Sequence, residues 1–319
     1  MTSYLLRRVP SAILVLLFAS MAIFAVIRLV PGDPATILAG QDASPEALAS
    51  IRADLGLDQP VLTQYLTWLA GMIRLDPGKS YMIGGDIGGL VRAGLLNTVV
   101  LTATALLFAV VLAGLAAIGS VLANRRWLDS VLAGANTLAV ALPTFVTGVL
   151  FVVVFAVILP ILPAGGTPPD GFFSRPGIAF QYLVLPALCL ALPSAAALAR
   201  FLTASLQTEL GKPYVTTAQA LGIRRRRIVL TQALPNALPA TVTVLGLQVG
   251  ALLGGAVLVE AIFAWPGLGL LIERAISDRD YPLVQALLLL SVLVFVVTQL
   301  LTDIVNAVLD PRIRLGGAS

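Results

Sequence analysis

Long apolar stretches separated by short polar segments dominate this sequence. About twenty consecutive apolar residues are enough to cross the hydrocarbon core of a bilayer, and six uncharged runs reach about that length. The pattern therefore predicts an all-α integral membrane protein with six transmembrane helices. The runs cover residues 9–27, 93–124, 130–169, 176–199, 228–259 and 281–302.

The third run is the only one long enough to suggest two crossings, and it contains Pro143 and Pro160. A second crossing would place the arginine block at residues 224–227 outside the cell, so we assign a single crossing. A proline inside a span removes one backbone hydrogen bond and bends the helix. We therefore expect a bend at Pro143.

The composition agrees with a membrane protein, because 58% of the residues are hydrophobic and 11% are charged, whereas about a quarter are charged in soluble domains. The mean hydropathy is +0.97. The chain has no histidine, which removes the usual metal ligand and general base. No pair of acidic residues lies in the middle of a span either, so we expect neither a metal site nor an intramembrane enzyme.

Basic residues are concentrated on one side of the predicted membrane. With the N-terminus inside, the cytoplasmic segments hold 12 of the 20 basic residues, as the positive-inside rule requires. Both termini are then cytoplasmic. The residues after the first run, 28–31, offer no cleavage site with small residues, so this run is a retained helix. These basic residues are Arg7, Arg8, Arg125, Arg126, Arg200, Lys212, Arg224, Arg225, Arg226, Arg227, Arg312 and Arg314.

The segment between the first two spans is long enough to have its own structure. Ser44 and Pro45 predict the start of a helix that runs to about residue 55, and a second helix is expected over 61–75. We expect its apolar stripe to pack on the mouth of the membrane domain, and direct contact with an external partner is the alternative. The stripe is Leu62, Tyr65, Leu66, Leu69, Met72 and Ile73.

These observations divide the chain into a first transmembrane helix at 1–30, an extracytoplasmic insertion at 31–94, a membrane core at 95–310 and a cytoplasmic tail at 311–319. The insertion contains Gly78, Lys79 and Ser80, which match the end of a phosphate-binding loop. That loop needs a glycine five residues earlier, where Ile73 stands, and a preceding strand. We therefore expect no nucleotide site in this chain.

The longest polar interruption in the second half covers residues 213–236. Pro213 is suited to the first position of a helix and Gly222 to its end, giving about nine helical positions, or roughly 13 Å. Such a short helix needs a partner to be stable. Each arginine at 224–227 would cost about 2.5–3.5 kcal/mol at the bilayer centre, so this segment lies in water. The small residues that would let another protein approach are Ala218, Ala220 and Gly222.

The fifth predicted span carries a row of glycines with a spacing of four residues, and such rows allow close helix contact in lipid. Packing within one bundle and packing against a second membrane subunit are both open. Glu260 follows at the outer end of this span. A carboxylate at the membrane interface needs no special role, and contact with a gate is the alternative. The residues of this group are Gly246, Gly250, Gly254, Gly255 and Glu260.

The polar segment at 212–236 resembles the EAA loop of ABC importer membrane subunits. Its consensus is a Glu-Ala-Ala cluster, three residues of any type, a glycine, nine residues of any type, a hydrophobic residue, one residue of any type and a Leu-Pro pair. Threonines replace the first two residues of the cluster, and Gln232 replaces a hydrophobic residue before Leu-Pro. In that family this loop forms a coupling helix that docks on a cytoplasmic ATPase. The corresponding residues are Thr216, Thr217, Ala218, Gly222, Leu234 and Pro235, with Ala220 inside the helix.

Four further strings resemble the dipeptide/oligopeptide branch of these permeases and occur in the same order: RLVPGDP at 28–34, AIFAWPGLG at 261–269, SDRDYPLVQA at 277–286 and LDPRIR at 309–314. The resemblance implies the type I importer fold in the bacterial plasma membrane. It implies a second homologous permease, two cytoplasmic ATPase domains and an extracytoplasmic substrate-binding protein as partners, and no nucleic acid. ATP and magnesium would bind to the partner subunits, and this chain itself would hold no cofactor.

The implied cargo is a dipeptide or oligopeptide, and nickel chelates, glutathione or haem-like solutes are alternatives within the same architecture. A secondary transporter is the rival function. Ionisable residues within the membrane normally mark proton or ion relays, but no Asp, Glu, Lys or His lies near the middle of a predicted span. No inverted repeat is visible either, so the sequence favours an ATP-driven importer.

Overall fold

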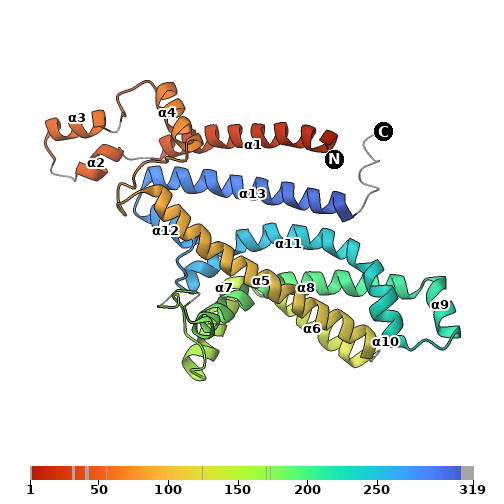
Figure 1. Ribbon diagram of the computed structural model, residues 1–319. Helices are drawn as coiled ribbons and strands as arrows, with labels where there is room; N and C mark the ends of the chain where they lie inside the picture. Colours follow the sequence, from red (N-terminus) through yellow and green to blue (C-terminus); the bar gives the residue numbers. More distant parts are fainter. Residues whose placement is uncertain are drawn as a thin grey trace. The chain divides into compact units, whose positions relative to one another are not determined.

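The computed structural model describes residues 2–30, 33–39, 43–54, 56–123, 125–169, 171–172 and 174–309 (Figure 1). Within these ranges the regular elements are helices, and a β-type contact occurs as an isolated antiparallel bridge between Lys79 and Asp86. The predicted cytoplasmic tail, residues 311–319, lies outside the described residues.

Among the described residues, five helices are long and apolar enough to cross a membrane, and one bent pair of helices can supply a sixth crossing. The prediction of an all-α membrane protein with six spans is therefore confirmed. The five helices are α1 (Thr2–Leu29), α5 (Ile87–Ala123), α8 (Pro176–Leu210), α11 (Leu234–Ile262) and α13 (Tyr281–Leu309).

The bent pair consists of α6 (Arg126–Ala141) followed by α7 (Thr144–Phe151) and the π-helix η1 (Val152–Ile158). The two parts meet at an angle of 104°. Leu142 is extended, with ψ of 124°, as expected for a residue that precedes proline. The predicted bend at Pro143 is therefore confirmed. The helix does not continue through it, however, because α6 ends at Ala141 and α7 begins at Thr144.

The chain forms two compact units, of residues 1–96 with 267–297 and of residues 97–266 with 298–319. Helices α5 and α13 each contribute residues to both units.

In the first unit, α4 (Val61–Ile73) packs on α1 through aromatic side chains. The ring centroid of Phe24 lies 5.3 Å from that of Tyr65 and 5.8 Å from that of Trp68. The hydroxyl oxygens of Ser20 and Tyr65 are 2.9 Å apart and share a hydrogen bond. Leu62 and Leu66 are more than half exposed, so the predicted apolar stripe is only partly the packing face. The other helices in this unit are α2 (Pro34–Ala39), α3 (Pro45–Asp54) and α12 (Leu268–Ser277).

Two contacts fix helix starts in the insertion, one of them local and the other with a distant segment. The Ala47 amide donates to the Ser44 side chain at 3.2 Å, which confirms the predicted helix start. The next span starts at Ile87 and not at about residue 95, because Ile87 is fully buried with Leu283 and Leu287 in a shared apolar cluster. The first turns of α5 are thus fixed by packing.

In the second unit, α8 is the central helix and packs against α6, α7 and α11. Its buried face includes Ala187, Ala191 and Ala195, whose small side chains let neighbouring helices approach closely. Trp265 closes one end of this core and is fully buried, and its indole N–H donates to the Asn97 carbonyl at 3.0 Å.

Candidate functional site

The polar segment contains a short helix, α9 (Pro213–Ala220), at the position predicted from Pro213 and Gly222. The helix ends where Gly222 adopts a left-handed φ of 76°. The Gly222 amide donates to the Gln219 carbonyl at 2.9 Å, and the Ile223 amide donates to the Ala218 carbonyl at 3.1 Å. This pair of bonds is a Schellman motif, so glycine at this position sets the end of the helix.

One face of α9 is buried within its own loop. Val215 and Ala218 form a small cluster with Ile228 of α10 (Arg225–Ile228), and Tyr214 and Ile223 pack around it. Ala218 is 5% exposed. The prediction that Ala218 lets another protein approach was therefore wrong, because its small side chain packs inside the loop.

The opposite face of α9 is open. Thr216, Thr217 and Ala220 are exposed, and Leu221 beyond them is 74% exposed. The sequence analysis missed Leu221, although a leucine directly before the helix-ending glycine of a polar segment is a signal that could have been used. An exposed leucine beside small and hydroxylated residues forms a surface on which a partner could dock.

A polar cluster around the buried Glu209 holds the start of α9 to the end of α8. Glu209 lies in the last turn of α8 and has an 11% exposed side chain. It accepts hydrogen bonds from the Lys212 ammonium at 2.6 Å and from the Tyr214 hydroxyl at 3.0 Å. The predicted loop has no glutamate at Thr216, but Glu209 provides an ion pair immediately before the helix.

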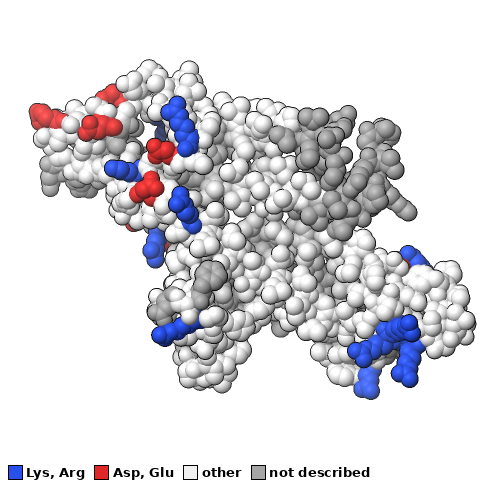
Figure 2. Space-filling view, viewed as in Figure 1, with Lys and Arg blue, Asp and Glu red and all other residues white. Residues whose placement is uncertain are grey.

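The basic block follows α9 and gives this end of the second unit a strongly positive surface (Figure 2). A guanidinium nitrogen of Arg225 donates to the Val121 carbonyl at 3.1 Å, which ties the block to the last turn of α5. The π-helix η2 (Val229–Ala233) then leads into α11. Leu234 packs against the apolar cluster beneath it, whereas Pro235 is exposed.

The glycine row lies further along α11. Gly250 and Gly254 have open space where a Cβ atom would stand, whereas a Cβ at Gly255 would lie 3.0 Å from Leu190. Close packing inside the described part of the chain therefore involves Gly255. Gly246 is half-buried. The role of Gly246, Gly250 and Gly254 in contact with a second subunit stays a prediction.

Glu260 lies at the opposite end of α11 from the α9 loop and is fully buried. Its carboxyl group accepts a hydrogen bond from the Thr98 hydroxyl at 2.6 Å, and its backbone carbonyl accepts from the Trp265 amide at 2.8 Å. Glu260 is thus at the end of its span, as expected, but it packs inside the second unit, and its contact with a gate stays a prediction. The following turn folds back over α5 and buries Glu260.

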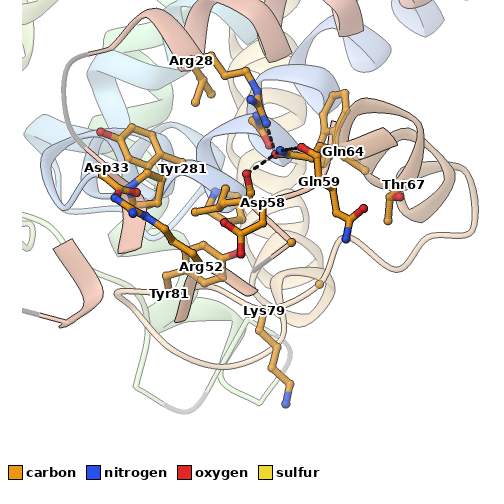
Figure 3. Close-up of a pocket in the computed structure, with 18 of the residues that line it drawn as sticks. Arg28, Asp33, Arg52, Asp58, Gln59, Gln64, Thr67, Lys79, Tyr81 and Tyr281 are labelled. Carbon is orange, nitrogen blue, oxygen red and sulfur yellow. Dashed lines mark hydrogen bonds and ion pairs between the residues drawn. The ribbon is translucent and has the colours of Figure 1, made fainter. Parts of the chain in front are cut away.

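The first unit contains a separate open cavity of about 870 Å³. Figure 3 shows that Arg28, from the end of α1, and Asp58, from the turn before α4, both contribute to its wall. Gln64 lies between these segments, and the sequence analysis assigned it no role. The wall also contains the aromatic side chains of Trp68, Tyr81 and Tyr281.

Two contacts in the wall involve titratable groups. Burial would raise the pKa of Asp33, but hydrogen bonds from Arg52 and the Ala35 amide, with the Arg52 charge, hold this pKa below its ordinary value. Burial, and then the nearby charge of Asp280, raise the pKa of Tyr81. Asp33 is therefore charged and paired, and Tyr81 stays protonated at neutral pH.

Comparison with known proteins identifies the family of this chain. Residues 106–315 match the family described as the binding-protein-dependent transport system inner membrane component. Residues 1–84 match the N-terminal family of the membrane components of such systems. Together these two regions include the α9 loop, the glycine row and most of the insertion.

Individual relatives agree with this assignment. The chain is 34% identical over 314 residues to the glutathione transport system permease protein GsiC of Escherichia coli K12, covering 98% of this chain and 99% of that protein. The GsiC protein of Salmonella typhi matches equally well. In fold, the chain is similar to a chain of the MetNI methionine ABC transporter in an inward-facing conformation, with a TM-score of 0.54 and 19% identity over 69% of this chain and 96% of that one.

One conclusion follows from these comparisons. The two family matches cover most of the chain, the relative is matched over almost its full length, and the permease fold is shared. The chain belongs to the binding-protein-dependent transport system inner membrane component family, and it is an ABC importer permease related to the dipeptide/oligopeptide branch.

Proposed function

We propose that this permease forms half of the translocation pathway of an ATP-driven importer for short peptides. A second homologous permease completes the pathway, and an extracytoplasmic binding protein delivers the cargo. Two cytoplasmic ATPase domains bind ATP and magnesium, and this chain holds no cofactor of its own. The protein lies in the inner membrane with both termini in the cytoplasm, as its distribution of basic residues favours.

The observation that carries the coupling role is the two-sided structure of α9. Val215 and Ala218 anchor the helix to Ile228, while Thr216, Thr217 and Ala220 face outward. A force applied to the outer face would reach α8 through the Glu209 cluster and α5 through the contact of Arg225 with Val121. We therefore assign the ATPase contact to the exposed face of α9 and to Leu221.

The cargo follows from the family and its relatives. Glutathione is a tripeptide, and GsiC, the permease protein of a glutathione transport system, is 34% identical to this chain. Dipeptides, oligopeptides and glutathione share amide bonds and free carboxylates. We therefore propose short peptides as the cargo class, with glutathione as one candidate member; nickel chelates and haem-like solutes are the alternatives.

The test is uptake of labelled dipeptide and labelled glutathione by cells that carry the gene, lack it, or carry Gly222→Arg. The arginine would occupy a left-handed position beside the docking face, so uptake should fall to the level of the deletion while the protein stays in the membrane. Gly177→Arg is the matched control, because Gly177 is exposed in the first turn of α8, far from α9, and has open space beside it.

Normal uptake by Gly222→Arg at normal abundance would contradict the coupling role. Unchanged uptake of both substrates in the deletion strain, with no other peptide importer expressed, would contradict the cargo class and favour a nickel chelate or haem-like solute.

A further inference from the structure

In the cavity of the first unit, the side chain of Gln64 contacts both the Arg28 guanidinium and the backbone around Asp58. Gln64 accepts a hydrogen bond from the Arg28 guanidinium through its amide oxygen. Its amide nitrogen donates to the carbonyls of Leu57 and Gln59, at 3.1 and 2.7 Å. Those two residues flank Asp58, so Gln64 fixes the guanidinium and the backbone on both sides of the carboxylate (Figure 3).

Arg28 is oriented by a second contact, because its guanidinium carbon lies 4.6 Å from the centre of the Phe24 ring. A guanidinium has five N–H donors, and the bond to Gln64 uses one side of the group. The remaining donors suit a carboxylate, which a guanidinium binds with two parallel hydrogen bonds. Arg28 is therefore preorganised to bind an anion.

The charges of the wall define the ligand further. Arg52 is paired with Asp33, which leaves Arg28, Lys79 and Asp58 as the other charged residues among the described residues of the wall. One carboxylate and one guanidinium on separate segments match the amino and carboxyl groups of a zwitterion. The Lys79 side chain extends away from the other labelled groups in Figure 3. Its charge still leaves Arg28, Lys79 and Asp58 with a net charge of +1, which favours a ligand with an additional carboxylate.

The rest of the wall suits an amphipathic ligand. Trp68, Tyr81 and Tyr281 present aromatic surface, and pockets of about 300–1,000 Å³ with aromatic walls and a few polar groups are typical of small-molecule sites. The indole N–H of Trp68 and the hydroxyl of Tyr281 are buried and have no hydrogen-bond partner within the described chain. A ligand with several carbonyl groups could supply acceptors if these side chains turned toward it.

We propose that this cavity is a binding site for short zwitterionic peptides and that it prefers peptides with an additional carboxylate. Arg28 binds the C-terminal carboxylate, Asp58 binds the N-terminal ammonium group, and Gln64 is a positioning residue for both. This proposal rests on the proposed peptide cargo. It adds that the permease itself distinguishes acidic from basic peptides, independently of the binding protein.

The test is equilibrium binding of radiolabelled Ala-Glu to the full-length permease in phosphatidylcholine nanodiscs without the binding protein. Ala-Glu should bind more tightly than Ala-Ala, and Ala-Ala more tightly than Ala-Lys. N-acetyl-Ala-Glu lacks the ammonium group and should bind more weakly than Ala-Glu. Arg28→Gln, Asp58→Asn and Gln64→Leu should each weaken Ala-Glu binding about tenfold or more, since hydrogen bonds to charged groups are lost.

Arg74→Gln is the matched control, because Arg74 is an exposed arginine at the end of α4 that does not line the cavity. Asp58→Lys tests the role of Asp58 in binding the ammonium group, because it predicts a gain of binding that a misfolded protein could not give. This variant should bind N-acetyl-Ala-Glu more tightly than the unaltered permease does, because it offers a second cation in place of the carboxylate.

Equal affinity for the three dipeptides, or equal affinity of Arg28→Gln and Arg74→Gln for Ala-Glu, would overturn the proposal. Displacement of labelled Ala-Glu by inorganic phosphate or anionic phospholipid at the same concentrations as by unlabelled Ala-Glu would overturn it in favour of a general anion site. Cellular uptake separates this proposal from the proposed function: gene-dependent Ala-Glu uptake without binding refutes the cavity alone, and binding without uptake refutes the cargo alone.

Discussion

The Ser80 hydroxyl donates a hydrogen bond to the Asp280 carboxyl group, although the two residues are 200 positions apart in the chain. The same carboxyl group accepts from the Met82 amide at 3.0 Å, and Asp280 is fully buried. Ser80 in turn accepts from the amides of Ile83 and Gly84, both at 3.1 Å. Asp280 therefore holds the end of the insertion to the start of α13.

We predict that Asp280→Ala loosens this connection. The Ser80 hydroxyl and the Met82 amide would lose their acceptor, and each buried unsatisfied group costs about 1–3 kcal/mol. Limited proteolysis of the purified permease should show faster cleavage at residues 79–86 and an unfolding midpoint a few degrees lower. Asp278→Ala, at an exposed position two residues earlier, should change neither; equal effects of the two variants would disprove this role of Asp280.

Gly222→Ala should weaken uptake even without a bulky side chain. At a φ of 76° an L-residue is strained by about 1–2 kcal/mol, so the Schellman motif should open in part of the population. Gly211→Ala is the control, because Gly211 has a φ of −81° and a Cβ there would make only ordinary contacts. Uptake that falls equally in both variants would mean that the backbone conformation of Gly222 is not the cause.

The buried pair of Thr98 and Glu260 leads to a third prediction. Glu260→Gln keeps an oxygen that can accept the Thr98 hydrogen bond and keeps the side-chain volume, so the protein should stay stable. Glu260→Ala should destabilise it by about 2–4 kcal/mol, through a cavity and a buried donor without its acceptor. Detergent-solubilised unfolding midpoints provide the measurement, and similar midpoints for the two variants would contradict a structural role for this carboxyl group.

Acid should release the contact between Asp33 and Arg52. The pKa of Asp33 is below its ordinary value of 3.8 in the folded protein, so the folded state favours the charged carboxylate. The stabilisation is present above pH 3.8 and is lost as the pH falls through the lower, folded pKa. Pepsin, which is active in acid, should cleave Arg52→Gln faster than the unaltered permease near pH 5, and the difference should shrink as the pH falls below 3.8.

A constant difference in pepsin cleavage between the two proteins across this range would show that the Asp33 charge does not contribute. The comparison is made at each pH separately, so the pH dependence of pepsin itself cancels.

Features that depend on a large free-energy cost within a few neighbouring residues could be predicted from the sequence. The cost of placing charges in lipid locates the spans and keeps the arginine block in water, and the special backbone needs of Pro213 and Gly222 define α9. These effects act within a few residues of one another. They depend little on which distant segment of the chain packs nearby, so the sequence of those few residues is sufficient to predict them.

The features that were missed depend on which face of a helix meets another segment. Ala218 and Ala220 are the same residue type two positions apart, yet only Ala218 is buried against Ile228. Glu260 is buried because the turn at Trp265 folds back over α5. The cavity wall is absent from the sequence analysis because Arg28 and Gln64 lie 36 positions apart and belong to no recognisable motif.

Helix α8 has 35 residues and is therefore about 52 Å long, whereas the hydrocarbon core is about 30 Å thick. The helix continues without a break through Pro186 and Pro193 to Glu209, where the ion pair with Lys212 fixes α9. Because the helix is continuous, a movement of its membrane part is carried to α9. A tilt of about 10° around its midpoint would move the α9 end by about 5 Å, so a small rotation inside the membrane corresponds to a displacement as large as one helical turn at the docking surface.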